Sequence, residues 1–394
     1  MKKFLLAASV SALATGAALA DEVRMGVLLG FTGPIESLTG HMADGAELAF
    51  SEINESGAFL GGQTIVPIRA DTGCVDSALA QASAERLITS DGVVAIMGAD
   101  CSGVTRAVLE NVAMANGIPM ISPSATSPAF TTFDSGGIFF RTAPSDARQG
   151  LVLASIVMER GIDTVAVTHT NNDYGRGFAD SFVANFEEMG GTVTIVVPHE
   201  EARGDYTAEV GTLSSAGGDA LVILGYVDGG GSVLRTAYEL GAFEQFFIGD
   251  GMFGDELVAN TGEALEGTIG TIPWASGEGT DRFHAMAAEA GINGESSYTR
   301  ESYDAAALLA LAAQAAGEAT PAGIAANIMN VANEPGEEIL PGDLARGLEI
   351  LANGGEVNFI GATNVNLVGP GEAAGFFREY VVENGEFVTI QYHQ

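Results

Sequence analysis

The sequence is 394 residues long and carries 51 acidic residues against 16 Lys and Arg, so its formal net charge at pH 7 is −35. A field of this strength repels nucleic acid and anionic lipid, which excludes both as general partners. The charge itself fits solubility or a salty habitat. A chain of this length exceeds one ordinary hydrophobic core, so we expect two domains.

Residues 1–20 follow the order of a cleaved secretory signal. Lys2 and Lys3 precede an apolar stretch rich in Leu and Ala, which ends in Ala18-Leu19-Ala20. That stretch is too short to span a membrane comfortably, and no other stretch is apolar for long enough. We therefore expect cleavage after Ala20 and a soluble, exported chain without membrane insertion. With 14 Arg and no Lys left against 51 acids, its charge would be 14 − 51 = −37.

The chain contains two cysteines, Cys74 and Cys101. In an exported protein a disulfide is the default interpretation, and a free pair or a redox site are the alternatives. No C-x-x-C motif and no adjacent His accompanies them, which argues against catalysis by these thiols. A bond between them would brace the turn that carries Ser102.

From Val23 onward the hydrophobic pattern alternates between short apolar runs and amphipathic segments. In the first half it predicts strands at 23–29, 64–70, 93–97 and 118–122 and helices at about 40–56, 76–89 and 102–115. After a short strand within 137–146 it predicts helices at 146–160, up to 189, 207–215 and up to 240, with strands at 164–168, 192–197, 220–224 and 246–248. Gly225 to Gly231 is interpreted as a turn. A buried helix at 301–317 and strands at 357–360 and within 375–390 complete the chain. Regular βα alternation predicts parallel sheets with helices on both faces.

Two predicted strands of the first half end in turns rich in hydroxyl groups. Strand 93–97 leads to Ser102 at a helix start, and strand 118–122 stops at a turn that contains Ser124 and Thr126. Ligands of open α/β sheets bind beyond the carboxyl ends of strands, and helix starts present unpaired N–H groups. The two turns together predict a site for a carboxylate or phosphate. Helix capping and turn formation are the alternative roles of Ser102 and Thr126.

The usual catalytic and metal-binding motifs are missing from the sequence. The five His residues are scattered singly, so we expect no metal site. Gly229 to Gly231 lacks the G-x-x-x-x-G-K-[ST] pattern of a phosphate loop. There is no G-x-S-x-G or H-E-x-x-H motif, and Ser102 has no His nearby in the sequence to activate it. The sequence therefore predicts a protein that is not an enzyme and has no cofactor.

Short motifs spread over almost the whole mature chain carry a family resemblance. They are Gly-Pro at 33–34, the two cysteines, Ser-Pro-Ser-Ala-Thr-Ser-Pro at 122–128, Phe-Arg-Thr at 140–142, Asn-Asp-Tyr-Gly-Arg-Gly at 172–177, Gly-Tyr at 225–226, Gly-Asp-Gly at 249–251 and Ser-Tyr-Asp-Ala-Ala at 302–306. In this order and spacing the chain resembles the periplasmic substrate-binding proteins of branched-chain amino acid ABC transporters, the leucine/isoleucine/valine-binding type.

The resemblance implies a type I periplasmic binding protein fold, in which two Rossmann-like lobes with parallel sheets are joined by a hinge that the chain crosses three times. It implies that residues 21–142 and 275–363 form lobe I and that 143–274 and 364–394 form lobe II. The expected crossings lie near 142–145, 272–276 and 363–370. Ligand would be enclosed between the lobes by hinge closure, as in a Venus flytrap.

The resemblance also assigns a set of ligand-binding residues. Ser102 and Thr126 would hold an α-carboxylate, and the turn residues Ser124, Ala125 and Cys101 would line the same end of the site. Cys74 and Cys101 would form the disulfide.

At the opposite end of the ligand, Asp250 would accept the α-ammonium while Tyr174 and Tyr226 close over the ligand. The alternatives are that Asp250 caps the following helix and that the tyrosines are surface aromatics. Leu38 stands where relatives often place an aromatic residue, and Asp100 adds a second acid near the cleft. These two departures admit a polar, cationic or amide-bearing ligand.

The function implied by the resemblance is capture of an amino acid in the periplasm and its delivery to an ABC permease with its ATPase subunits. We expect a monomer. A ligand-sensing subunit for amino acids, amides or other small carboxylates, which reports to a receptor, is the first alternative. An exported hydrolase on a Rossmann-like fold is the second.

Overall fold

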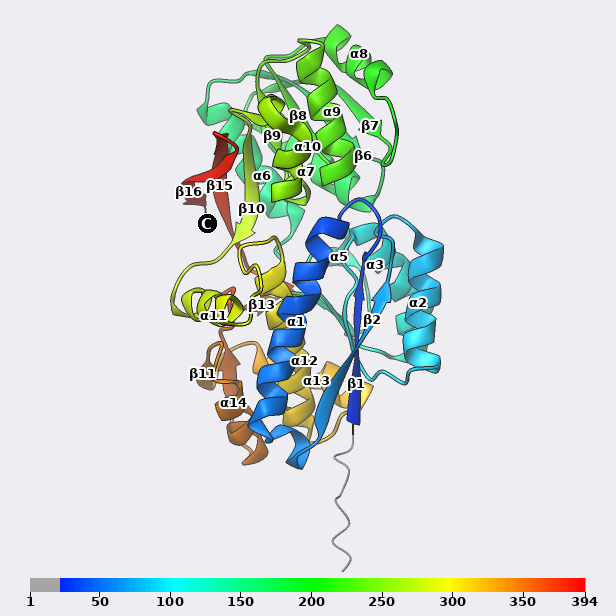
Figure 1. Cartoon of the computed structure of the whole chain (residues 1–394), viewed down its shortest axis with the longest axis vertical. Helices are drawn as coiled ribbons and strands as arrows, with labels where there is room; N and C mark the ends of the chain where they lie inside the picture. Colours follow the sequence, from blue (N-terminus) through cyan, green and yellow to red (C-terminus); the bar gives the residue numbers. More distant parts are fainter. Residues whose placement is uncertain (1–21, 394) are drawn as a thin grey trace, which may run out of the picture.

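The computed structural model describes residues 22–393, so the predicted signal peptide and its cleavage after Ala20 lie outside the described residues. The chain forms two lobes stacked along the long axis of the molecule (Figure 1), each built on a seven-stranded sheet. Helices cover both faces of these sheets. Over residues 22–393 the helices are all too short or too polar to cross a bilayer.

The first sheet has the strand order β13-β14-β5-β4-β3-β1-β2. Its strands are β1 (Glu22–Leu29), β2 (Thr64–Asp71), β3 (Ile96–Gly98), β4 (Met120–Ser122), β5 (Phe139–Arg141), β13 (Leu367–Val368) and β14 (Glu372–Ala373). Strands β1 to β5 pair in parallel, as the βα alternation predicted. The helices of this part are α1 (Glu36–Ser56), α2 (Ser77–Thr89), α3 (Ser102–Val108), α4 (Met114–Asn116), α5 (Ala129–Thr132), α11 (Glu278–Glu289), α12 (Thr299–Ala316), α13 (Pro321–Val331) and α14 (Leu344–Ala352). A small parallel sheet of β11 (Glu337–Ile339) and β12 (Val357–Phe359) lies beside α14.

The second sheet has the order β16-β15-β10-β9-β8-β6-β7. Its strands are β6 (Thr164–Thr170), β7 (Thr192–His199), β8 (Ala220–Leu224), β9 (Phe246–Ile248), β10 (Ile269–Trp274), β15 (Phe376–Glu383) and β16 (Glu386–His393). Strands β6 to β10 pair in parallel, and β15 and β16 continue the sheet in antiparallel pairing. The helices are α6 (Asp146–Glu159), α7 (Asp173–Glu188), α8 (Thr207–Ala216), α9 (Val227–Glu239) and α10 (Asp255–Thr261).

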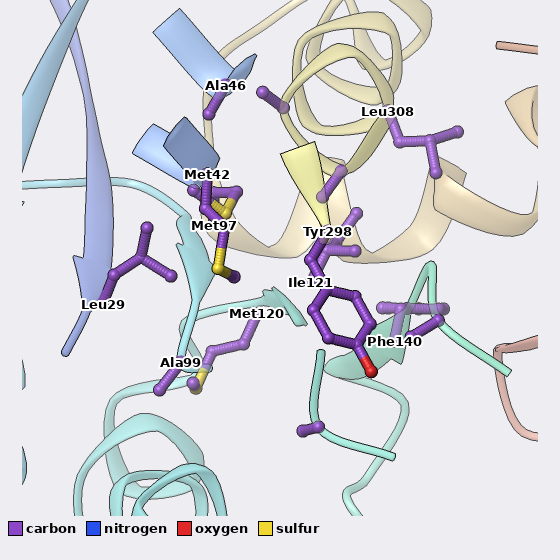
Figure 2. Packing of buried hydrophobic residues seen from close by; sticks show 14 of the residues in the cluster. Leu29, Met42, Ala46, Met97, Ala99, Met120, Ile121, Phe140, Tyr298 and Leu308 are labelled. Atoms are coloured by element: carbon purple, nitrogen blue, oxygen red, sulfur yellow. The ribbon is translucent and has the colours of Figure 1, made fainter. Parts of the chain in front are cut away.

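The core of the first lobe is centred on α12. Its residues from Ala305 to Ala313 are fully buried, as the Ala/Leu composition predicted. Helix α1 packs closely against α12, because a Cβ on Gly45 would lie 2.3 Å from the Thr299 carbonyl oxygen. Figure 2 shows Met42 and Ala46 of α1 among the side chains that fill this core. The tight packing fixes the start of α12, and with it the preceding Tyr298.

The chain passes between the sheets three times. These crossings connect β5 to α6, β10 to α11, and β14 to β15. The third crossing therefore lies between Ala373 and Phe376, later than the predicted 363–370, and residues 364–373 belong with the first sheet. The Asn333 side chain holds this segment by accepting from the Leu367 N–H and donating to its carbonyl, each at 3.0 Å. Strands of two residues are too short to leave a readable hydrophobic pattern.

The turn predicted at residues 225–231 is wrong, because α9 begins at Val227 and contains all three consecutive glycines. A Cβ on Gly229 would lie 2.3 Å from Glu201 Oε2, and one on Gly230 would lie 2.7 Å from Met252 Sδ. The glycines therefore allow the Glu201 and Met252 side chains to pack closely against the helix.

Candidate functional site

A small cavity lies between the lobes, beyond the ends of strands from both sheets. Its lining residues are Ile35, Leu38, Met42, Asp100, Cys101, Ser102, Ser124, Tyr174, Tyr226, Asp250, Gly251 and Tyr298. The cavity volume is about 20 Å³, close to what one water molecule needs. The two walls are therefore almost in contact.

The predicted site residues separate into two groups in the structure. Leu38, Cys101, Ser102, Ser124, Tyr174, Tyr226 and Asp250 come together around the cavity. Ala125 and Thr126 are fully buried but are not among the lining residues. The Thr126 backbone carbonyl accepts from the Asp146 N–H at 2.9 Å, which places Thr126 beside the first crossing.

The first-lobe wall consists of two turns that are hydrogen-bonded to each other. Ser102 Oγ accepts from the Ser127 N–H at 3.2 Å, and Ser124 Oγ donates to the Asp100 carbonyl at 3.2 Å. The Ser122 hydroxyl also accepts from the Ala125 N–H at 2.9 Å. Because a hydroxyl has one donor and two acceptor positions, Ser102 can brace the turn and still donate to a ligand oxygen. No histidine is among the described residues that line the cavity.

The predicted disulfide between Cys74 and Cys101 is present. It connects the loop after β2 to the turn that carries Ser102. Asp100 strengthens the same connection: its Oδ2 accepts from the Gly30 N–H at 2.6 Å and its Oδ1 from the Thr72 hydroxyl at 3.0 Å. Asp100 thus borders the cavity, as expected, but both carboxyl oxygens are bonded to first-lobe loops.

Arg141 supports the second turn from behind. The fully buried guanidinium donates to the carbonyls of Ala125 and Ser127 at 3.0 and 2.9 Å and pairs with Glu372 of β14. The edge strand β14 therefore provides the counter-charge for an arginine that shapes the 122–128 turn. This contact explains why residues after 363 must stay with the first sheet.

The second-lobe wall is centred on Asp250, at the end of β9. Tyr174 Oη donates to Asp250 Oδ1 at 3.1 Å, and Tyr298, which comes from the first lobe, donates to Oδ2. Tyr174 stacks on Tyr226 with ring centres 5.2 Å apart, and Asn172 donates to the Tyr226 hydroxyl at 3.2 Å. Both stacked tyrosines are buried, which contradicts the alternative that they are surface aromatics.

The electrostatics of Asp250 follow from this burial. Desolvation raises the pKa of Asp250, and hydrogen bonds from Tyr298 and Tyr174 counteract part of that rise. Burial and the Asp250 charge in turn raise the pKa of Tyr298 well above its usual value, so Tyr298 remains a donor. Asp250 is thus an acceptor held by neutral phenols, and no cation pairs with it among the residues described.

The sequence interpretation missed Asp146, a buried acid that does not line the cavity but whose ionisation is affected by the charge of Asp250. It is the first residue of α6, it is fully buried, and neither carboxyl oxygen has a hydrogen-bond partner within residues 22–393. Burial and then the charge of Asp250 raise the pKa of Asp146 well above its ordinary value. Its position fits an ordinary helix start, with Ser145 as the N-cap, so the local pattern gave no sign of a second role.

Tyr298 was missed as well. It precedes α12 with a left-handed backbone (φ 64°) and reaches Asp250 from a segment 48 residues later in the chain. Its only signal would have been an aromatic residue just before a long buried helix. The cavity therefore combines hydroxyl groups on one wall with the buried Asp250 carboxyl group at the other.

Comparison with known proteins shows which family the chain belongs to. A family model described as "Periplasmic binding protein" matches residues 22–347. A Leu/Ile/Val-binding protein homolog from Brucella melitensis is 31% identical over 315 residues, 79% of this chain and 82% of the relative. The substrate-binding protein of a chemotactic signal transduction system from Halobacterium salinarum is 30% identical over 365 residues, 88% and 83% of the two chains.

The solved structure of a leucine-binding protein from Thermotoga maritima superposes with a TM-score of 0.80 at 25% identity, covering 94% of this chain and 99% of that one. The two-lobed fold agrees with this structural match. The chain belongs to the periplasmic binding protein family, a class of proteins that bind small ligands between two lobes.

Proposed function

We propose that this protein captures an amino acid between its lobes and delivers it to an ABC permease. The observation that carries this proposal is the polarity of the cavity. Ser102 offers a neutral hydroxyl donor at one wall, and Asp250 offers an acid at the other. A zwitterion needs donors at its carboxylate and an acid at its ammonium, and both interactions strengthen in a desolvated site. The Leu/Ile/Val-binding relative supports the same ligand class.

Ligand binding would use contacts that now join the lobes. Tyr298 of the first lobe donates to Asp250 of the second, and Thr142 in the first crossing donates to the Glu301 carbonyl of α12 at 2.8 Å. An incoming ammonium would bind Asp250 in place of the Tyr298 hydroxyl or beside it. The space it needs must come from a hinge opening, because the cavity is only about 20 Å³. Closure over the ligand would then re-form the contacts between the lobes.

Calorimetric titration with a panel of matched ligands tests the proposal. We expect L-leucine, L-isoleucine or a polar amino acid to bind, and the same skeletons without either the ammonium or the carboxylate to bind at least about 100-fold more weakly, because a buried partner is left unpaired. Equal affinity for 4-methylpentanoate and L-leucine would contradict the zwitterion assignment.

The carboxylate end has its own test. We expect Ser102→Ala combined with Thr126→Ala to weaken amino acid binding by about 10- to 100-fold, almost all of it from the loss of the Ser102 hydroxyl, since one hydrogen bond to a charged group is worth roughly 1.5–3 kcal/mol. Ser102→Ala alone should reduce the preference for an amino acid over its methyl ester, because Ser102 lines the cavity. Thr126→Ala alone should leave that preference unchanged. The exposed Ser214→Ala in α8 is the control, and circular dichroism should show an intact fold in every variant.

A sensing role is a second candidate, supported by the chemotactic relative. The binding site would be the same, and the partner would be a receptor in place of the permease. Deletion of the gene separates the two roles: loss of amino acid uptake indicates transport, whereas intact uptake with lost chemotactic response indicates sensing.

The export of the protein is also part of the proposal. We propose that it is a periplasmic monomer whose leader is cleaved after Ala20. The family supports the compartment. Amino-terminal sequencing of the mature protein should begin at Asp21, and light scattering should give the mass of one chain.

A further inference from the structure

Among the described residues, two buried arginines at the seam between the lobes form no ion pair within 4.0 Å, although the charges of Glu301 and Glu295 act on them from a longer distance. Arg300 is 1% exposed and Arg378 is 7% exposed. Nine other arginines form ion pairs, and they are Arg24, Arg69, Arg86, Arg106, Arg141, Arg160, Arg203, Arg282 and Arg346. The remaining three, Arg148, Arg176 and Arg235, are exposed to water. In a chain with 51 acidic residues, the two unpaired and buried guanidinium groups stand out.

Both guanidinium groups lie against one indole ring. The Arg300 guanidinium carbon is 4.0 Å from the Trp274 ring centre, and that of Arg378 is 4.8 Å away. Arg300 stands in the first turn of α12 in the first lobe, whereas Trp274 ends β10 and Arg378 lies on β15 in the second sheet. Contacts with an aromatic face stabilise a cation only in part, and each guanidinium still needs acceptors for its N–H groups.

Several of these N–H groups have no acceptor. Within residues 22–393, Arg300 Nε and Nη1 and Arg378 Nε are buried without a hydrogen-bond partner. The hydrogen bond that Arg378 does make runs from Nη2 to the Phe387 carbonyl at 3.0 Å. Glu301, the neighbour of Arg300 in the chain, forms no ion pair with it within 4.0 Å. Leaving a buried charge without a partner is strongly unfavourable, so binding of an anion here would stabilise the two guanidinium groups.

The surroundings define which anion fits. Arg378 lines a cavity of about 520 Å³ at the seam between the lobes, so solutes can reach the guanidinium. Asp255, Glu256, Glu295 and Glu386 also line this cavity, and all four are exposed. Their charges repel multivalent anions more strongly than monovalent ones. Phe253 and Trp274 beside the arginines favour an anion that gives up its water easily.

We propose that a small, monovalent, weakly hydrated inorganic anion such as chloride or bromide binds at Arg300 and Arg378. Because the two arginines belong to different lobes, the bound anion reduces their mutual repulsion in the closed arrangement. Anion and amino acid then favour the same closed state, and each tightens binding of the other. This coupling rests on the proposed function, whereas binding of the anion itself does not.

Chloride nuclear magnetic resonance on the mature protein tests the site without any amino acid. We expect ³⁵Cl line broadening that bromide removes, that is lost in Arg378→Met and that persists in Arg235→Met, a matched change at an exposed arginine. Crystals of the unchanged protein soaked in bromide should show an anomalous peak beside Arg300 and Arg378. Absence of that peak, or equal broadening in the two variants, would overturn the proposal.

Coupling to the ligand is measured separately. At constant ionic strength, replacing strongly hydrated fluoride by chloride should raise the Tm by about 2 °C or more and tighten amino acid binding about threefold. Unchanged amino acid affinity together with a clear bromide peak would reject the coupling and retain the site. Absence of any amino acid binding with a clear peak would reject the proposed function instead.

Discussion

Replacing Asp250 by Asn should weaken amino acid binding by more than about 100-fold without lowering the stability of the fold, and Asp250→Ala should weaken it at least as much. The loss follows because a desolvated ammonium would be left without its acid, which costs about 3–5 kcal/mol when one partner of a buried pair is removed. Asp250 is 2% exposed, so water cannot take over the interaction.

The free energy of unfolding of Asp250→Asn should be equal to that of the unchanged protein or higher. Burial raises the folded-state pKa of Asp250, so ionisation costs stability as pH rises from the unfolded-state pKa to the folded one. That cost is fully present above the folded pKa, and Asn cannot ionise. The Tyr174 and Tyr298 hydroxyls can still bond to an amide, as donor to its oxygen or acceptor from its nitrogen.

Titration calorimetry and thermal unfolding at pH 8 check both statements. Asp255→Asn is the matched control, because Asp255 is an exposed acid just beyond the same strand end. It should change neither the dissociation constant nor the Tm. An unchanged dissociation constant for Asp250→Asn would remove its role at the ammonium.

Amino acid binding should release a proton and should weaken as the pH falls. Asp146 and Asp250 are both fully buried, and the charge of Asp250 opposes ionisation of Asp146. The pair therefore keeps a proton to a higher pH than exposed carboxyl groups do, and the titration belongs to the pair as a whole. A bound ammonium favours the fully ionised pair, so the proton leaves when the ligand arrives. Affinity is then full at high pH and is lost as pH falls through the raised pKa.

The groups that face this pair define its titration. Tyr174 and Tyr298 donate to Asp250, Thr126 lies beside Asp146, and Arg141 partly lowers the pKa of Asp146. Neither tyrosine changes charge below neutral pH, since burial raises the pKa of both well above the usual value. The dependence on pH therefore reports the two acids.

Calorimetry in two buffers of different ionisation enthalpy counts the released protons. We expect up to about one proton per ligand and a loss of affinity of up to about tenfold per pH unit over the titrating range. Asp146→Asn should abolish the release. Glu201, whose pKa burial raises to about 7, is another buried acid that does not line the cavity, so Glu201→Gln is the control that should keep the proton release. Identical heats of binding in both buffers would contradict the prediction that Asp146 and Asp250 share a proton that leaves when the ligand binds.

Local periodicity was enough to predict most of the elements. The run from Ala220 to Leu224 and the one from Phe246 to Ile248 are strands with the predicted bounds. Helix α2 starts one residue later than predicted, because Asp76 caps it by accepting from the N–H groups of Ala78 and Leu79. The two-cysteine composition predicted the disulfide because an exported chain leaves few other uses for such a pair.

Where the functional side chains meet was partly predictable. Ser102 and Ser124 follow adjacent strands of one parallel sheet, so their proximity follows from topology. Asp250 could be placed opposite them only through the family resemblance. Thr126 lies beside Asp146 and away from the cavity because of the conformation of the first crossing. No local sequence pattern predicts that conformation.

The amino-acid order by itself determined the βα alternation and the hydroxyl-bearing turns, because each of these depends on neighbours within one strand, one helix or one loop. It also limited the disulfide to one possible pairing, because the chain has only two cysteines. The tertiary structure decided that Asp146 lies near Asp250, that Tyr298 reaches across the seam, that the last crossing follows β14, and that Arg300 and Arg378 share one indole. These outcomes depend on burial and charge among residues that are distant in the chain, and desolvation acts only once the lobes have packed together.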